Sequence, residues 1–383
     1  MSFILMKRGE IYSPEYDGTK DILIANDKIF LVERNISESV VNSLDKNVKI
    51  IDASKCIVIP GFIDQHVHIN GAGGEGGPQY RTPPIQLNEL IKAGITSVIG
   101  LLGTDGFARS LKALLMKAKG LENEGVSTWI YTGAYQYPTP TITGDILSDI
   151  MLIDKVIGVK IALSDHRSSH PTVDELKKMI SKARVGGMLA GKAGIVHIHM
   201  GSEKIGLNPL FEIIKNTEIP IEQFAPTHLN RNEDLFKSAI SFGKMGGYID
   251  LTTPKSSKAV KRLIENGVSI ERITMSTDGN GSIPTFNEKK EITGMTIASV
   301  SSLHKEFIDI IKKEKMSVQD AVRVSSTNIA NHLKLEQKGE IKEGKDADLL
   351  VLDKDSLQIK YVIAKGKIMM KNEKIMKFGT FEN

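Results

Sequence analysis

The stretch Pro60-Gly-Phe-Ile-Asp-Gln-His66-Val-His68 decides the fold class, because it has the pattern of a buried strand that ends in two histidines. Stretches of helical character, such as residues 172–189 and 231–244, separate this run from further apolar runs. Alternating strands and helices are typical of a parallel sheet. Eight such units in roughly 270 residues match a (β/α)₈ TIM barrel. The predicted strands are residues 61–68, 96–103, 128–135, 156–163, 194–200, 221–228, 248–251 and 273–276.

A doubly wound open sheet is the alternative α/β architecture for this alternation of strands and helices. The barrel makes the sharper prediction, because catalytic groups of TIM barrels lie at the carboxyl ends of the strands. In this sequence the residues that can carry chemistry follow the predicted strands. We therefore expect the barrel.

The two ends of the chain share a different pattern of short β-like runs broken by Gly, Asn and Asp, which is typical of hairpins. Neither end is long enough to build a core alone, so we predict that both pair in one small β-sandwich domain. The expected division is residues 1–58 and 340–383 for this domain and 59–339 for the barrel.

Composition and charge narrow the class of protein. Of 383 residues, 40% are hydrophobic and 25% charged, and the net charge of +4 is spread along the chain without a basic block. We therefore expect no nucleic-acid partner. Cys56 is the single cysteine, which excludes an intrachain disulfide and suits a reducing compartment. Without a signal-like start or a long apolar span, we expect a cytoplasmic protein that does not enter a membrane.

Histidines end three of the predicted strands. His66 and His68 are two residues apart and therefore point to one face of a strand, where both could reach one metal ion. His197 and His199 end the fifth run in the same way. His199 lies nearer the carboxyl end of the strand, so we favour it as a ligand and expect His197 to be a buried, hydrogen-bonded neighbour. His228 ends the sixth run.

Asp278 ends the eighth run and adds a carboxylate to this set. Imidazole and carboxylate together suit zinc or a similar divalent ion. Five protein ligands exceed the three of a usual catalytic zinc site, so we predict two ions that share them. Ordinary surface or capping roles are expected for the histidines in loop or helix contexts, which are His166, His170, His304 and His332.

Lys160 ends the fourth run and admits two interpretations. It could extend its ammonium group to the barrel rim. Alternatively, burial next to divalent cations would disfavour its charge, and the neutral amine could react with CO₂ to give a carbamate. The two oxygens of a carbamate could bridge both metals.

Longer motifs make the chain resemble the isoaspartyl dipeptidase family of the amidohydrolase superfamily, from about Ile51 to the stretch Gly344-Lys-Asp-Ala-Asp-Leu-Leu. The His-x-His motif marks only the superfamily. The Gly-rich loop with Glu75, the Asp-His-Arg stretch and the Asn-Arg-Asn stretch after His228 are specific to the dipeptidases. Besides residues 60–68, the resemblance rests on Gly71-Ala-Gly-Gly-Glu75, Gly100-Leu-Leu-Gly-Thr104-Asp, Thr132-Gly-Ala-Tyr135, Ile157-Gly-Val-Lys160, Ser164-Asp-His-Arg167-Ser, His199-Met-Gly, Pro226-Thr-His228-Leu-Asn-Arg231-Asn and Ser276-Thr-Asp278-Gly-Asn-Gly-Ser282.

The resemblance implies a binuclear zinc centre that cleaves β-aspartyl dipeptides with a bridging hydroxide. It implies that one zinc is held by three side chains and the other by two, with a carboxylated Lys160 between them. Asp278 would also act as general base and then acid, and Tyr135 would hydrogen-bond the oxyanion. The first zinc would be held by His66, His68 and Asp278, and the second by His199 and His228.

The residues expected to bind the substrate follow from the free amine and the two free carboxylates of a β-aspartyl dipeptide. Glu75 suits the amine, and Arg167 and Arg231 suit the carboxylates, because guanidinium pairs bidentately with carboxylate. The resemblance adds hydrogen bonds to the aspartyl part from Gly73, Thr104 and Ser282. It also implies a homo-oligomer, in the form of an octamer.

Two alternatives compete with this interpretation. A cyclic amide hydrolase, such as a dihydroorotase or hydantoinase relative, could share the metal centre, but a ring amide has no free amine for Glu75. A non-catalytic barrel used as a scaffold would be expected to lose metal ligands, and all six are present here.

Overall fold

The computed structural model describes residues 2–287 and 292–382. Its centre is a parallel sheet of six strands, in the order β11-β10-β9-β8-β7-β6. Neighbours in space are also neighbours in sequence, as expected for repeated strand–helix units. The strands are β6 (Phe62–Val67), β7 (Ile95–Gly100), β8 (Ser127–Gly133), β9 (Val156–Leu163), β10 (Ile195–Met200) and β11 (Phe224–Thr227).

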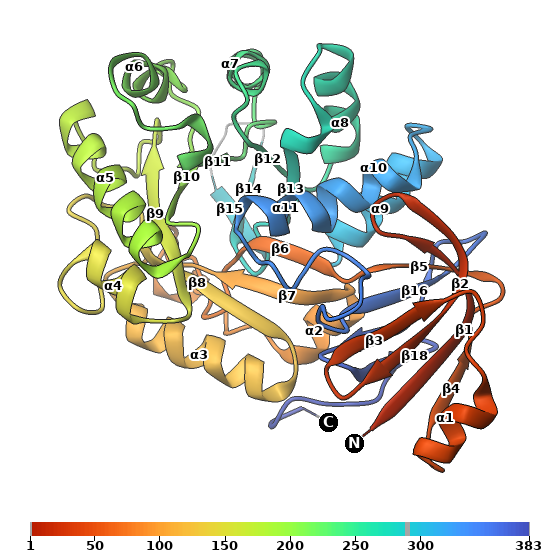
Figure 1. Ribbon diagram of the computed structural model, residues 1–383. Helices are drawn as coiled ribbons and strands as arrows, with labels where there is room; N and C mark the ends of the chain where they lie inside the picture. The colour runs from red at the N-terminus through yellow and green to blue at the C-terminus, as the bar shows by residue number, and fades with distance from the viewer. Residues whose placement is uncertain (1, 288–291, 383) are drawn as a thin grey trace.

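Two more parallel strands, β12 (Ile249–Thr252) and β13 (Ile273–Ser276), continue the chain order. The Leu229 amide next to β11 donates to the carbonyl of Asp250 in β12 at 3.3 Å, and the His68 amide after β6 donates to the Gly279 carbonyl at 2.8 Å. These bonds place the pair between β11 and β6 (Figure 1). The α/β class with a curled parallel sheet is thus confirmed, whereas the hydrogen-bonded ladders cover six and two strands, and full closure into a barrel stays a prediction.

Helices follow the strands and cover the outer face of the curled sheet (Figure 1). One hydrophobic core joins both layers; Val98 of β7, Leu114 of α3 and Ile180 of α5 belong to it. Strands buried on both faces explain the continuous apolar runs of the sequence. The helices are α2 (Leu87–Lys92), α3 (Leu111–Glu124), α4 (Ile146–Leu152), α5 (Val173–Ala190), α6 (Asn208–Asn216), α7 (Glu233–Lys244), α8 (Ser256–Glu265), α9 (Ser302–Lys312), α10 (Val318–Val322) and α11 (Asn328–His332).

Local sequence explains where α5 begins and ends. Thr172 accepts a hydrogen bond from the Glu175 amide, and the Glu175 carboxylate accepts one from the Thr172 amide, which forms a capping box. At the other end Gly191 adopts a left-handed conformation with φ 65°, which glycine enters without a steric penalty.

Strands from both ends of the chain form a second sheet of nine strands, shown red and blue in Figure 1. The antiparallel pair β5–β16 joins the N-terminal strands to the C-terminal ones, which confirms that the two ends pair. All nine strands belong to one hydrogen-bonded sheet, and its folding into the two layers of a sandwich stays a prediction. The strands are β1 (Phe3–Tyr12), β2 (Tyr16–Ala25), β3 (Lys28–Glu33), β4 (Lys49–Asp52), β5 (Cys56–Pro60), β16 (Leu349–Asp353), β17 (Ile359–Ala364), β18 (Lys367–Lys371) and β19 (Lys374–Ile375), with α1 (Glu38–Leu44) between β3 and β4.

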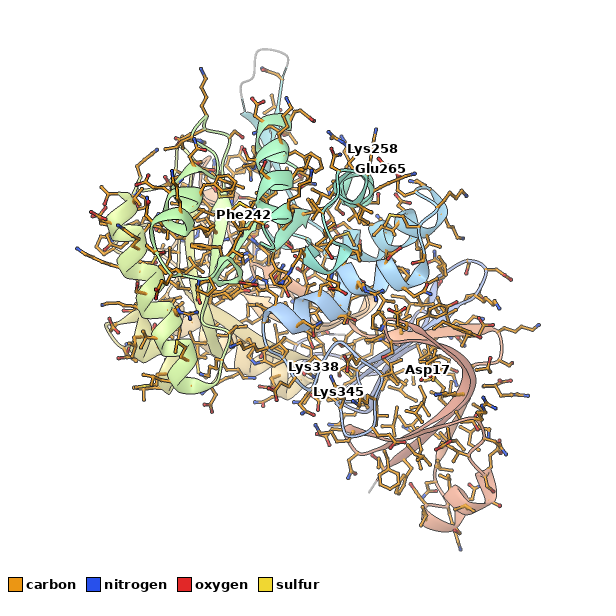
Figure 2. All side chains as sticks on the ribbon, turned by 45° about the horizontal axis from the view of Figure 1, so that its top comes forward. Asp17, Phe242, Lys258, Glu265, Lys338 and Lys345 are labelled. Carbon is orange, nitrogen blue, oxygen red and sulfur yellow. The ribbon has the colours of Figure 1, made fainter. Side chains whose placement is uncertain are left out.

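A buried lysine connects this sheet to the curled one. Lys338, labelled in Figure 2, donates to the hydroxyl of Ser127, the first residue of β8, at 2.6 Å. Its ammonium group also pairs with Asp346 at 2.8 Å and with Asp348, just before β16. The position of the terminal sheet against the α/β part is therefore set by a buried ionic cluster as well as by packing.

The hairpin β14 (Ser282–Phe286) and β15 (Ile292–Ile297) follows β13. Single helical turns lie at η1 (Pro78–Tyr80), η2 (Ile221–Gln223), η3 (Ile270–Arg272) and η4 (Arg323–Thr327). Across residues 2–287 and 292–382, no helix combines the length and the apolar character that crossing a membrane requires.

Candidate metal centre and active site

The histidines predicted as ligands meet at the carboxyl ends of β6, β10 and β11. The ring centroids of His66 and His68 lie 5.5 Å apart, those of His66 and His228 5.0 Å, and those of His199 and His228 4.4 Å. Asp278 completes the cluster, because its Oδ1 lies 3.2 Å from His66 Nε2 and 3.1 Å from His68 Nε2. Strand ends far apart in the sequence thus bring their polar groups to one point.

The backbone is strained at two of these residues. His228 has φ 64° and Asp278 has φ 53°, in the left-handed region that non-glycine residues seldom adopt. Such strain costs about 1–3 kcal/mol and is typical of functional sites.

Burial favours the neutral form of three imidazoles of the cluster, those of His66, His199 and His228. It lowers the pKa of His66 to about 3 and the pKa values of His199 and His228 well below the ordinary range. Burial alone would raise the pKa of Asp278, but the neighbouring His66 and His68 hold it well below its usual range. The cluster therefore offers imidazole lone pairs and one carboxylate anion.

The donor set fits a divalent cation. Ligand atoms of His66, His228 and Asp278 all lie within 4.8 Å of one another. The Nδ1 of His228 hydrogen-bonds Thr252 Oγ1 at 2.6 Å, while its buried Nε2 has no hydrogen-bond partner. A buried acceptor without a partner is costly, and a metal ion would satisfy it.

His197 lies behind the cluster rather than in it. Its Nε2 is 2.8 Å from His66 Nδ1, and its ring stacks on Tyr131 at a centroid distance of 4.8 Å. This contact uses the His66 nitrogen that faces away from Asp278. Hydrogen bonds of this kind set the orientation of histidines that bind metals.

Lys160 points into the cluster from β9. The residue is fully buried, and its Nζ lies 3.4 Å from His66 Nε2. Burial lowers the pKa of Lys160 to about 7, and the positive charge of Arg231 contributes to that shift. The side chain does not reach solvent, as a lysine extended to the rim would.

Glu75 occupies the centre of a second group of predicted residues. Its Oε1 accepts from Thr104 Oγ1 at 2.8 Å and from Arg167 Nη1 at 3.2 Å, and its Oε2 accepts from Ser282 Oγ at 3.2 Å. Gly73, two residues earlier, has φ +89°, and a Cβ there would lie 2.2 Å from the Tyr80 carbonyl oxygen. Only glycine fits this turn of the loop.

Tyr135, which follows β8, and Arg231, which follows β11, also lie near the cluster. The Tyr135 hydroxyl is 2.7 Å from His199 Nδ1, and burial raises the pKa of this phenol, so it remains a hydrogen-bond donor. Arg231 is exposed, and its backbone amide donates to the His228 carbonyl at 3.0 Å. Within the described ranges its guanidinium forms no ion pair, which leaves it available to a ligand.

The remaining histidines lie outside the cluster, as expected, although His332 is buried rather than at the surface. His166 is exposed, and His170 pairs with Glu203 at 3.0 Å. His304 donates to the Leu357 carbonyl at 2.9 Å, and His332 stacks on Tyr248.

Three buried carboxylates beside the cluster were not predicted. Asp64 accepts from the Thr277 amide at 3.3 Å, and Asp250 accepts from Gln65 Nε2 at 2.7 Å. Asp165 lies 3.0 Å from His199. Asp64 and Asp165 lie in stretches that the sequence analysis quotes, but only that of Asp165, shared with Arg167, is specific to the resembled family.

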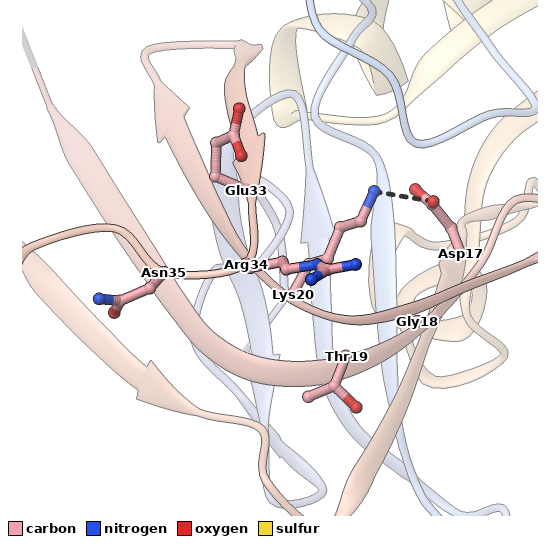
Figure 3. Close-up of a pocket in the computed structure, with 7 residues that line it drawn as sticks. All are labelled: Asp17, Gly18, Thr19, Lys20, Glu33, Arg34 and Asn35. Atoms are coloured by element: carbon pink, nitrogen blue, oxygen red, sulfur yellow. Dashed lines mark hydrogen bonds and ion pairs between the residues drawn. The ribbon is translucent and has the colours of Figure 1, made fainter.

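Cavities lie both beside and away from this site. One of about 340 Å³ is lined by the Gly-rich loop with Glu75 and by Thr104 and Asp105. Another of about 770 Å³ lies on the terminal sheet between β2 and the end of β3, where Lys20 pairs with Asp17 at 2.7 Å (Figure 3). Neither lining contains a histidine, but the first cavity adjoins the candidate site through Glu75, which accepts a hydrogen bond from Arg167.

The fold and this site are those of a class of hydrolases that act on amide-type bonds. The family model described as "Amidohydrolase family" matches residues 57–369, and the chain belongs to this family of enzymes. More particularly, it is similar to crystal structures of β-aspartyl dipeptidase from Fervidobacterium islandicum AW-1. The complex of that protein with a β-Asp-Leu dipeptide is 42% identical, with a TM-score of 0.92 over 99% of this chain and 100% of that one. A second structure is 41% identical, with a TM-score of 0.90 over the same shares of the two chains.

Curated relatives are more distant. A dihydroorotase from Clostridium acetobutylicum is 22% identical over 96% of this chain and 93% of its own length. A dihydroorotase from Elusimicrobium minutum is 36% identical, but the match spans 26% of this chain and only 22% of that protein.

Proposed function

We propose that this enzyme is a metal-dependent dipeptidase that hydrolyses isoaspartyl (β-aspartyl) dipeptides. The observation that carries the proposal is the position of Glu75, whose carboxylate meets Thr104, Ser282 and Arg167 beside the histidine cluster. The similarity to a β-aspartyl dipeptidase that binds β-Asp-Leu supports it.

The charges at the site match such a substrate. Glu75 receives the free α-amino group, and Thr104, Ser282 and the backbone at Gly73 hydrogen-bond the aspartyl part. Arg167 and Arg231 receive the carboxylates, because a guanidinium group pairs with a carboxylate through two parallel hydrogen bonds. The scissile amide then lies toward the histidine cluster.

Two divalent ions, with zinc as the expected metal, occupy the cluster in this proposal. His66, His68 and Asp278 would hold one ion, His199 and His228 would hold the other, and a carboxylated Lys160 would supply a further anionic ligand. The full burial of Lys160 supports the last assignment, because only the neutral amine reacts with CO₂. When bound, the ions lower the pKa of a water molecule and polarise the scissile carbonyl.

Two side chains of the protein move or hold protons in the reaction. The Asp278 carboxylate takes a proton from the attacking water and delivers it to the leaving amine. The Tyr135 hydroxyl donates a hydrogen bond to the oxygen that becomes negative during attack. A donor of this kind is worth about 2.7–4 kcal/mol of transition-state stabilisation.

The proposal extends to architecture. The eight parallel strands close into a (β/α)₈ barrel, residues 59–339 form the hydrolase domain, and residues 1–58 and 340–383 form the small β domain. The protein assembles as a homo-oligomer, in the form of an octamer, in the cytoplasm.

A cyclic amide hydrolase is the second candidate, favoured by the similarity to a dihydroorotase over most of the chain. The deciding assay compares β-aspartyl-leucine with dihydroorotate and hydantoin, using zinc-loaded and chelator-treated protein. Cleavage of the dipeptide alone, lost on chelation and regained with metal, is the expected result. Turnover of a ring amide in preference to the dipeptide would refute the proposal, and so would full activity of metal-free protein.

A further inference from the structure

A single buried carboxylate, that of Asp165, links the histidine cluster to the arginine proposed to bind substrate. Its Oδ2 lies 3.0 Å from His199 Nε2 and 2.8 Å from Arg167 Nη2. Its Oδ1 accepts from Arg167 Nε at 2.9 Å and from the Arg167 amide at 2.8 Å. Asp165 is only 3% exposed, so these contacts replace its hydration.

The carboxylate decides which nitrogen of His199 carries a hydrogen. A carboxylate oxygen only accepts, so Nε2 is the donor in this contact. Arg167 Nη2 also lies 3.3 Å from Nε2, but it has its own acceptor in Asp165 Oδ2. The neutral ring therefore keeps its lone pair on Nδ1, the nitrogen that receives the Tyr135 hydroxyl at 2.7 Å.

The same carboxylate also fixes the direction of Arg167. Two nitrogens of the guanidinium group, Nε and Nη2, are engaged by Asp165 in a fork. The remaining nitrogen, Nη1, points to Glu75 at 3.2 Å. An arginine held in this way loses little further side-chain freedom when a carboxylate ligand binds.

We propose that Asp165 is a positioning residue that keeps the His199 hydrogen on Nε2 and aims Arg167 at the substrate. The Nδ1 lone pair, which accepts from the Tyr135 hydroxyl here, is then the one that a metal ion takes when it displaces that hydroxyl. This inference rests on the proposed function and adds a residue to it. The arrangement follows the carboxylate–histidine–metal pattern, in which loss of the carboxylate weakens metal binding about 10–100-fold. Because one group serves both partners, metal affinity and substrate affinity change together.

The test uses the D165N variant of the full chain, with E203Q as a matched control. Glu203 also meets a histidine Nε2 at 3.0 Å, that of His170, but this pair is exposed and lies outside the cluster. Zinc affinity is measured by titrating metal-free protein in competition with a chromophoric chelator. The expected result is one of two zinc sites weakened about 10–100-fold in D165N, with both sites unchanged in E203Q.

Kinetics on β-aspartyl-leucine provide the second readout. At saturating zinc, the D165N protein is expected to recover turnover but to keep a raised KM, because Arg167 has lost its anchor. A D165A variant, with circular dichroism to verify the fold, removes the acceptor altogether and should weaken the same zinc site at least as much.

The outcomes separate this inference from the proposed function. Wild-type protein that binds no zinc or leaves the dipeptide intact would overturn both. Suppose instead that the wild-type protein binds two zinc ions and cleaves the dipeptide. Folded D165N and D165A proteins with unchanged zinc affinity and KM would then overturn the role of Asp165 alone.

Discussion

At the scale of single residues, chemistry depends on what surrounds each side chain. Lys160 has an ordinary ammonium group, yet it is fully buried and 3.4 Å from an imidazole nitrogen of His66. Surface lysines of the same chain keep their charge in water. Burial at the cluster instead favours the neutral amine, which is the form that the proposed carbamate requires.

Replacing Lys160 with alanine should reduce dipeptide hydrolysis to near background. The loss should exceed about 100-fold, since even groups that only orient metal ligands are worth about 10–100-fold. Short carboxylic acids added to the assay should restore part of the rate, because their two oxygens can take the place of the carbamate. Initial rates with and without acetate check this expectation.

Lys192 provides the control for that substitution. It is partly buried, and its ammonium group donates to the carbonyls of Ile150 at 2.7 Å and Ile153 at 2.8 Å, away from the cluster. The K192A protein should keep its activity and show no response to the acids. A K160A protein that is fully active without additive would contradict the carbamate.

The Arg231→Lys substitution should raise KM for β-aspartyl-leucine more than it lowers kcat. Lysine keeps the positive charge but loses the bidentate geometry, while the metal ligands remain. One charge-assisted hydrogen bond is worth about 1.5–3 kcal/mol, so KM should rise roughly tenfold or more. Steady-state kinetics measure the effect.

The matched control is Arg262→Lys, because Arg262 is partly exposed and pairs with Glu233 at 2.7 Å rather than with the cluster. Its kinetics should equal those of the wild type. If KM and kcat of the R231K protein equalled those of the wild type, Arg231 would not be a substrate-binding residue.

At the scale of elements, capping residues determine where helices begin. The predicted helix 172–189 is observed as α5, Val173–Ala190, with Thr172 as its cap. The predicted strand 221–228 begins later than expected: residues Ile221–Gln223 form a 3-10 turn, and β11 starts at Phe224. An apolar run alone does not show where a strand begins, and the exposed Glu222 already marks residues 221–223 as less buried than β11.

Thr172→Ala should lower the free energy of unfolding by about 1 kcal/mol, because the Glu175 amide loses its acceptor at the helix start. Activity should remain unchanged, since α5 lies on the outer layer. Urea unfolding followed by circular dichroism measures the difference, and Thr172→Ser, which retains the hydroxyl, should restore wild-type stability. A T172A protein as stable as the wild type would show that the capping box contributes little.

At the scale of the whole molecule, the buried cluster around Lys338 joins the two sheets. Lys338→Met should lower the free energy of unfolding by about 3–5 kcal/mol, because Asp346 and Asp348 lose a buried counter-ion. Lys345, also labelled in Figure 2, pairs with Glu340 at 2.6 Å in a more exposed position. Lys345→Met should cost less than about 1 kcal/mol. Denaturant unfolding of both variants checks the contrast, and equal losses would contradict it.

Local sequence was sufficient to predict the alternation of strands and helices and the types of residue at the strand ends. These features depend on hydrophobic periodicity and on residues close in the chain, such as His66 and His68 on one face of β6. Motifs of the family added Glu75 and Arg167, although not the hydrogen bonds between them. Only the tertiary structure decided that His197 supports His66 and that Asp165 joins His199 to Arg167. Partners such as His66 and His197, 131 positions apart, meet because β6 and β10 belong to one curled parallel sheet, and no local pattern encodes that contact.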